Sequence, residues 1–353
     1  MKKDMKKITL VVDSRQLADL LKTGDSIILT NESKENAPTI KAESITIDND
    51  KFRPLLQGVR TNEFTKVRST KRNTKYIPLL ERHVIKRNNL IIDVPKPLKP
   101  AGLRAPTYQL FDAVMVCLTK TGASTEPNFS PKVELSLAEY QKMRGLKSRE
   151  KTRVQVQAAL QILSNIKLSY RRYSRGLNGK DKLDEMSEMT LFPTVRITRK
   201  GIIEVWINAQ YWALLQHCNI MLYPTILLRI NNQKNPNSYA IGRKIAELKN
   251  LNFNKRNENI VSVKTLLENA PYIPSCDDDI KSRGSGITRN IIEPLERDLN
   301  AFKEIFTWEY VTKQNGVTSY KEFVNRKIKI TWKNYPRVRM PKKDILEDSQ
   351  KNN

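Results

Sequence analysis

Residues 133–164 read VELSLAEYQKMRGLKSREKTRVQVQAALQILS and contain the start and stop signals of two consecutive helices. Ser136 and Glu139 stand three residues apart, the spacing of a capping box at a helix N-terminus. Gly145 suits the end of that short helix, because glycine adopts the left-handed backbone conformation without strain. A second, longer helix is predicted to begin near Ser148 and to run to about residue 164. The stretch therefore predicts two helices joined by a tight turn.

The longer helix has one apolar face and one polar face. The apolar positions recur at helical spacing and predict a buried stripe of Val156, Ala159, Leu160 and Leu163. Most other positions carry side chains that are compatible with DNA: Arg149, Lys151, Arg153, Gln155, Gln157 and Gln161. The pattern is typical of a helix that packs on a core and presents a basic face.

The segments on either side extend this pair of helices to a larger motif. Upstream, Thr107 is predicted to cap a helix that stops at Gly122, and a short strand is expected at 133–135. Downstream, three strands are predicted at 167–173, 190–198 and 202–207, with Lys200-Gly201 as the tight turn between the last two. This order of helix, strand, helix, turn, helix and strand ribbon is that of a winged helix-turn-helix.

The same order of elements recurs in the second half of the chain. Residues 235–238 open a helix, a brief strand follows at 260–261, and Ser262 is predicted to cap a short helix. A long helix then runs to about residue 302 with a kink at Pro294, since proline removes a backbone hydrogen bond. Two closing strands are predicted at 306–312 and 327–332.

The chain is therefore predicted to be an α+β protein with two tandem winged helix-turn-helix domains and a small N-terminal α/β extension. The extension covers residues 1–75, with short strands at 8–13 and 26–30, and it ends in a basic segment. The predicted domains are 76–219, which includes a proline-rich joint at 95–106, and 220–336, followed by a polar tail at 337–353.

The charge of the chain indicates a polyanionic partner. Its 353 residues include 63 Lys and Arg against 37 Asp and Glu, a formal net charge of +26. Such an excess repels itself in a compact state unless a partner neutralises it, and nucleic acid is the usual partner. Ribosome-associated and membrane-surface proteins are also basic, so these classes stay open on charge alone. Three widely separated cysteines without zinc-like spacing, and the lack of a signal peptide or membrane span, predict a reduced, cytoplasmic protein.

No catalytic, metal or cofactor site is predicted. The two histidines, His83 and His217, lie far apart, whereas a relaxase or rolling-circle initiator needs closely spaced histidines to hold its metal. Residues 176–180 lack the spacing and the hydroxyl residue of a phosphate-binding loop. Residues 277–279 are three aspartates without the alternating ligands and the glycine of a calcium loop. The chain is interpreted as a binding protein rather than an enzyme.

The predicted DNA contacts lie at the start of each longer helix and in the first ribbon. Arginine pairs with guanine and glutamine with adenine, while ribbon arginines suit phosphates or the minor groove. In the first domain the predicted contacts are Lys147, Ser148, Arg149, Lys151, Thr152, Arg153, Gln157, Arg171, Arg172 and Arg175. In the second domain they are Lys281, Ser282, Arg283, Ser285, Thr288, Arg289 and Asn290.

Five short strings resemble segments of the tandem winged-helix replication initiators of plasmids and of initiator-like proteins on Gram-positive mobile elements. The strings are TYQLFD at 107–112, LAEYQKMRG at 137–145, NPNSY at 235–239, IIEPLER at 291–297 and ITWK at 330–333. The resemblance covers about residues 105–335. Residues 1–75 and 271–284 depart from the better-known members.

The resemblance implies a protein that binds repeated origin sites in double-stranded DNA, opens the duplex nearby and brings in the host initiator and replicative helicase. It also implies a homodimer through the first winged helix, which would repress the protein's own promoter. Three alternatives remain: a transcriptional regulator of the same fold, a nuclease with unrecognised acids, and an RNA-binding or ribosome-associated protein.

Overall fold

The computed structural model describes most of the chain between residues 51 and 336. The described ranges are 51–57, 59–67, 73–87, 89–96, 98–99, 102–121, 131–175, 181–216, 219–253, 255–273, 286–312 and 319–336. All of them fall within the unit formed by residues 46–336. The strands predicted at 8–13 and 26–30, the loop aspartates at 277–279 and the polar tail lie outside the described residues. Helices and antiparallel strands alternate, which makes this unit a mixed α+β structure.

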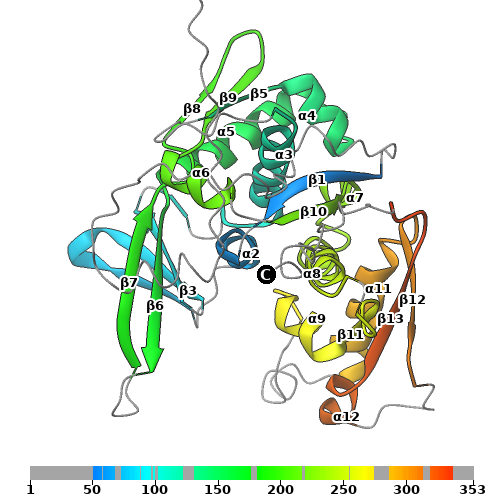
Figure 1. Ribbon diagram of the computed structural model, residues 1–353. Coiled ribbons are helices and arrows are strands. Elements are labelled where there is room, and N and C mark those ends of the chain that lie inside the picture. The colour runs from blue at the N-terminus through cyan, green and yellow to red at the C-terminus, as the bar shows by residue number, and fades with distance from the viewer. Residues whose placement is uncertain are drawn as a thin grey trace, which may run out of the picture. The chain divides into compact units, whose positions relative to one another are not determined.

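Helix α3 (Ala105–Thr121) is buried on every side. Tyr108, Leu110, Phe111 and Val114 are fully buried, and so are the polar residues Gln109 and Asp112 on the same helix. The predicted cap at Thr107 is wrong, because the helix starts two residues earlier and Thr107 donates its hydroxyl to the carbonyl of Gly102 at 2.7 Å. Pro106 fits inside the first turn, where a missing backbone N–H costs nothing. Figure 1 shows α3 between α5 and β1.

The helix-turn-helix predicted from residues 133–164 is present with its signals in place. Strand β5 (Lys132–Ser136) leads into α4 (Leu137–Arg144), whose N-terminus carries the complete capping box of Ser136 and Glu139. Gly145 ends α4 at a φ of 62°. Ser148 then caps α5 (Arg149–Asn165), and the predicted apolar stripe of α5 is buried. Strands β5, β9 (Ile202–Trp206) and β8 (Thr194–Ile197) form an antiparallel sheet in that order.

A five-stranded antiparallel sheet corrects the predicted ribbon. Its order is β2 (Thr74–Ile77), β3 (Arg82–Arg87), β4 (Leu90–Pro95), β6 (Lys167–Arg175) and β7 (Asp181–Met189). Strand β6 therefore pairs with β4 and β7 and is not part of the sheet that holds β8 and β9. Strand β7 was not predicted, because its sequence is rich in charged residues with low strand propensity and is ordered by pairing with β6.

Residues 52–67 belong to the core and not to a separate N-terminal extension. Strand β1 (Phe52–Gln57) pairs with β10 (Asn219–Pro224), which follows α6 (Ala209–Gln216) and precedes α7 (Ile226–Arg229). Helix α2 (Val59–Lys66) inserts Phe64 against Tyr108 and Phe111 of α3, with 5.2 Å between ring centroids in each case. The predicted boundary after residue 75 is therefore wrong. The pairing of β1 with β10 could not be predicted, because the sequence of a strand does not reveal a partner strand that lies far along the chain.

The second series of elements follows the predicted order, except that a short helix, α12, was not predicted between the two closing strands. It comprises α8 (Ser238–Leu251), β11 (Ile260–Ser262), α9 (Val263–Asn269), the π-helical turn η4 (Thr288–Ile292), α11 (Glu293–Asn300), β12 (Phe306–Tyr310), α12 (Tyr320–Val324) and β13 (Lys327–Trp332). Ser262 caps α9 as predicted, and β11, β13 and β12 form an antiparallel sheet in that order. The proline kink takes the form of a wide turn. Glu293 donates its N–H to the carbonyl of Thr288, and Pro294 then falls in the first turn of α11, where its missing N–H is tolerated.

A buried ion pair joins the two series. Asp112 of α3 is fully buried and accepts hydrogen bonds from Arg243 of α8 and from the Tyr239 hydroxyl, the latter at 2.6 Å. Burial raises the pKa of Asp112, and the Arg243 guanidinium and the Tyr239 hydroxyl oppose that rise. A charge of this kind is tolerated inside a protein only while its partner is in place.

Replacing Asp112 by Ala is expected to lower the free energy of unfolding by about 3–5 kcal/mol, because it leaves the Arg243 charge buried without a partner. Chemical denaturation followed by fluorescence measures the change. The exposed pair of Lys96 and Glu81, with its 2.7 Å contact, supplies the control: Lys96→Ala is expected to leave the midpoint nearly unchanged. Equal midpoints for Asp112→Ala and the parent protein would contradict the role of this pair.

Candidate nucleic-acid interface

The exposed face of α5 is the first candidate surface for a polyanion. Lys147, Arg149, Lys151 and Gln157 are all exposed, and Glu150 is the acid among them. The N-terminus of α5 adds the partial positive charge of the helix dipole. Ser148 accepts a hydrogen bond from the backbone N–H of Lys151 at 3.3 Å, so its side chain serves first as the cap of the helix.

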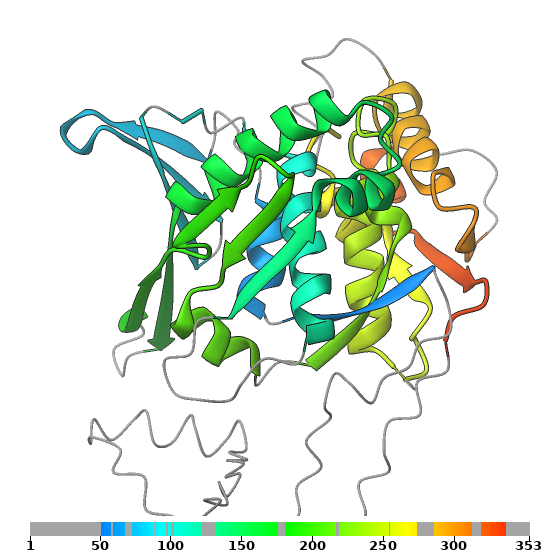
Figure 2. The same ribbon diagram turned by 90° about the horizontal axis from the view of Figure 1, so that it is seen from above.

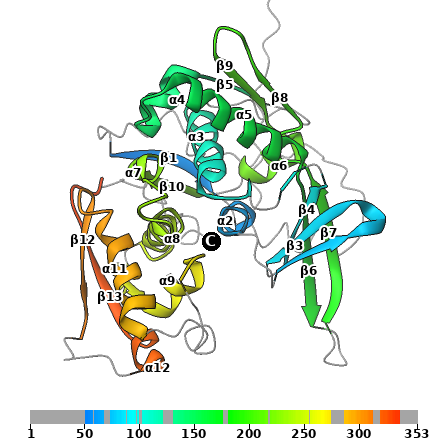
Figure 3. The ribbon, with the colours of Figure 1, turned by 180° about the vertical axis from the view of Figure 1, so that it is seen from behind.

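The turn between β8 and β9 lies directly beside this end of α5 (Figures 1 and 3). Arg153 of α5 donates from Nη2 to the carbonyl of Thr198 at 3.0 Å. Gly201 has a φ of 85°, and a Cβ at this position would lie 3.4 Å from Nη2 of Arg149. The first residue of α4, Leu137, donates its N–H to the carbonyl of Gly201 at 2.7 Å. The helix-turn-helix and the hairpin turn are therefore held as one rigid surface.

The turn brings two basic residues to the surface that sequence reasoning did not select. Arg199 and Lys200 are exposed at the tip of the hairpin. Arg196 of β8, three residues before Arg199, is paired with Glu204 at 3.4 Å. A hydrogen bond from the Lys132 ammonium lowers the pKa of Glu204. The exposure of these two residues, Arg199 and Lys200, could have been predicted from the Lys200-Gly201 turn, because a hairpin turn projects its side chains away from the sheet.

Two of the predicted DNA contacts in α5, Thr152 and Arg153, bond to the protein's own backbone. Thr152 is 1% exposed and donates its hydroxyl to the carbonyl of Ser148 at 2.6 Å, so the prediction that it contacts DNA is wrong. It sits one turn before Val156 and continues the buried stripe, which its small, half-apolar side chain allows. Arg153 is half-buried and bonds to the hairpin turn, so it positions the turn against the helix.

The arginines of β6 are not placed as predicted. Arg171, Arg172 and Arg175 lie in the five-stranded sheet, outside the sheet of β8 and β9. In the register of β6 and β7, Arg172 stands opposite Glu185 and Arg175 opposite Asp181.

In the second series the structure describes part of the predicted site. Thr288 and Arg289 are exposed on η4, and Asn290 is half-buried beside them. Glu296, one turn beyond η4, accepts a hydrogen bond from the Tyr310 hydroxyl of β12 at 3.0 Å and so joins α11 to its sheet. Lys281, Ser282, Arg283 and Ser285 lie outside the described residues.

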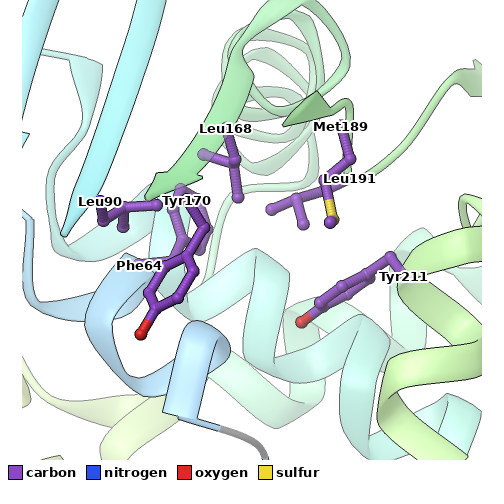
Figure 4. A pocket seen from close by; sticks show the side chains of 7 residues that line it. All are labelled: Phe64, Leu90, Leu168, Tyr170, Met189, Leu191 and Tyr211. Atoms are coloured by element: carbon purple, nitrogen blue, oxygen red, sulfur yellow. The ribbon is translucent and has the colours of Figure 1, made fainter. Parts of the chain in front are cut away.

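A small apolar pocket lies apart from both surfaces. Figure 4 shows its lining, which includes Phe64, Leu168, Met189 and Tyr211. Its volume of about 10 Å³ has room for one water molecule at most, so it is a packing gap and not a cofactor site. Within the ranges that the structure describes, no three His, Cys, Asp or Glu side chains gather closely enough to hold a metal ion. None of the described helices is both long and apolar enough to cross a bilayer.

Comparisons with known proteins give structural likenesses alone. No family model and no curated protein matches the chain. A structure of domains 2 and 3 of RctB is 9% identical with a TM-score of 0.45, and the match covers 77% of this chain and 98% of that one. A structure of the Pi initiator protein in complex with iteron DNA is 9% identical with a TM-score of 0.46, covering 82% of this chain and 100% of that one.

Proposed function

We propose that the protein binds specific sites in double-stranded DNA as the replication initiator of a plasmid or similar mobile element. The observation that carries the proposal is the joint surface of α5 and the β8–β9 turn, where Lys147, Arg149 and Lys151 lie beside Arg199 and Lys200. A chain with a net charge of +26 has a strong electrostatic attraction to a phosphate backbone.

The arrangement suits a winged helix that binds a duplex. The N-terminal part of α5 would enter the major groove, where Arg149 and Gln157 would meet base edges. Arg199 and Lys200 would contact the adjacent backbone. In the same way, η4 and α11 with the β12–β13 hairpin would form a second winged helix, in which Arg289 and Asn290 would reach the bases. Two such units in one chain would recognise a long site or a repeat.

Further parts of the proposal concern action at an origin. The protein would open the duplex near its sites, bring in the host initiator and replicative helicase, and form a homodimer through its first winged helix. It would work in the cytoplasm as a binder without catalytic activity. The alternative is a winged-helix transcriptional regulator, including an autorepressor, because the same surface would bind a promoter without opening it.

Two substitutions separate base contacts from phosphate contacts on the first surface. Arg149→Ala is expected to weaken specific binding by about 1–3 kcal/mol and to relax specificity at one base pair. Lys200→Ala is expected to weaken binding to all sequences alike and to reduce the slope of log K against log salt by about 1. Titrations by fluorescence anisotropy at several salt concentrations measure both effects. Arg256→Ala, which removes an exposed charge from the loop after α8, is the control and should change neither.

The second surface is tested at η4. Arg289→Ala is expected to cost about 1–3 kcal/mol at one base pair of the site and to leave the other positions unaffected. Competition binding with a set of single-base variants of the site measures this. A variant that ranks all of these sites as the parent protein does would show that Arg289 reads no base.

A footprint on the DNA of the protein's own element, with permanganate as the probe for unpaired thymines, tests the function as a whole. Protected repeats beside a reactive AT-rich stretch are the expected result. Protection of a promoter without reactive thymines would favour the regulator. Lack of a discrete footprint at physiological salt would contradict sequence-specific duplex binding, and strand nicking with magnesium or manganese would contradict the absence of catalytic activity.

A further inference from the structure

The hairpin of β2 and β3 has an apolar tip whose leucine side chains are not buried in the core. Its turn is the 3-10 helix η2 (Pro78–Leu80), and the side chains of Leu79 and Leu80 are 92% and 57% exposed. Tyr76 beside them is 38% exposed. Single exposed leucines are common, but two in succession at the end of a projecting hairpin are a contiguous apolar patch. Figures 1 and 2 show the hairpin extending away from the helices of this unit.

The tip is held in one conformation. Pro78 opens η2, and Glu81 closes it in the left-handed region with a φ of 47°, donating its N–H to the carbonyl of Pro78 at 3.1 Å. Lys96, which follows β4, donates its N–H to the carbonyl of Glu81 at 2.8 Å and its ammonium to the Glu81 carboxylate at 2.7 Å. A tip fixed in this way needs little ordering when it binds.

The strands that carry the apolar tip have basic residues farther down the hairpin, where Lys75 stands opposite Val84 and Lys86 donates its N–H to the carbonyl of Asn73. Lys75 and Lys86 are exposed on β2 and β3, whereas Arg82, next to the tip, pairs with Asp93 of β4 at 3.8 Å. The acid at the tip, Glu81, is neutralised by Lys96. A polyanion complements the positive charge of Lys75 and Lys86, whereas a second copy of this hairpin would bring like charges together.

An apolar tip on a hairpin with exposed lysines resembles the elements that some DNA-binding proteins insert between base pairs. Leucine and proline side chains that enter the minor groove push between base steps and unstack them, while nearby cations hold the phosphates. The hairpin is also connected to the C-terminal end of α5 through its sheet, because Lys167 at the start of β6 stands opposite Asp93 of β4. Strand β6 begins directly after α5 and shares a sheet with β4 and β3, so the tip and α5 are parts of one framework.

We propose that the tip formed by Leu79 and Leu80 inserts between base pairs of duplex DNA that the protein has bound, and that it starts the opening of the duplex. This inference rests on the proposed binding of double-stranded DNA and assigns the opening step to a defined element. The α5 surface supplies the position along the DNA, and the hairpin tip supplies the distortion.

The test uses the full chain, a DNA fragment carrying the footprinted site, and 2-aminopurine placed at successive positions, because its fluorescence rises when it is unstacked. The parent protein is expected to raise the fluorescence at one step beside the site. The variant with both Leu79→Ala and Leu80→Ala is expected to lose most of that rise, by about fivefold, with the footprint retained. Leu79→Phe is expected to keep the rise, and Leu251→Ala, which trims an exposed leucine of α8, is expected to behave as the parent.

The possible outcomes separate the wedge from DNA binding itself. An unchanged fluorescence rise in the double alanine variant would overturn the wedge and leave the binding function intact. A parent protein without a footprint would overturn both. If the double variant instead shifted the protein from dimer to monomer in sedimentation and kept the fluorescence rise, the tip would be a protein interface and the inference would be wrong.

Discussion

Asp112 and Arg243 form a buried ion pair between two helices whose residues are 131 positions apart in the sequence. The same region contains further polar contacts that join α2, α3 and α4 to α7 and α8. Gln109 of α3 donates to the carbonyl of Leu227 at 2.7 Å, and Arg144 of α4 donates to the carbonyl of Leu228 at 2.9 Å. Lys66 of α2 pairs with Glu247 of α8 at 3.0 Å, with both side chains largely buried. A buried polar group destabilises the protein when its partner moves out of hydrogen-bonding range. These contacts therefore constrain how α3 and α8 pack together.

This constraint matters for the surface that we propose to bind DNA. Helix α3 packs against α5, while α8 packs against α9 and α11. The ion pair therefore connects α3, which supports α5, to α8, which supports α11. Within the first series, Arg153 and Leu137 tie α5 and α4 to the β8–β9 turn. Recognition of a duplex requires side chains held at fixed positions relative to the grooves, and rigid supports of this kind supply that condition. The apolar tip of the β2–β3 hairpin is joined to the same framework through β4 and β6.

Local signals predicted the helix-turn-helix and much of the second series correctly. The Ser136 and Glu139 capping box, Gly145, the Ser148 and Ser262 caps and the apolar stripe of α5 act through neighbours within one or two helical turns, which is why they are readable in the sequence. The predicted contacts at Lys147, Arg149, Lys151 and Gln157 lie on an exposed face, although binding itself remains a prediction. The prediction that Thr152 contacts DNA was wrong because helical periodicity places it at the edge of the buried stripe. A threonine at such an edge is compatible with either a buried or an exposed position.

The sequence by itself determined the α+β class, the helix-turn-helix with its caps, and the net charge of +26. The tertiary structure alone decided that β6 joins the five-stranded sheet, that β1 pairs with β10, and that Asp112 meets Arg243. It also decided that Arg199 and Lys200 lie beside α5 and that Leu79 stands at an exposed tip. The reason is physical: caps and helical faces depend on residues close in sequence, whereas strand partners and buried ion pairs depend on segments that meet after the chain has folded.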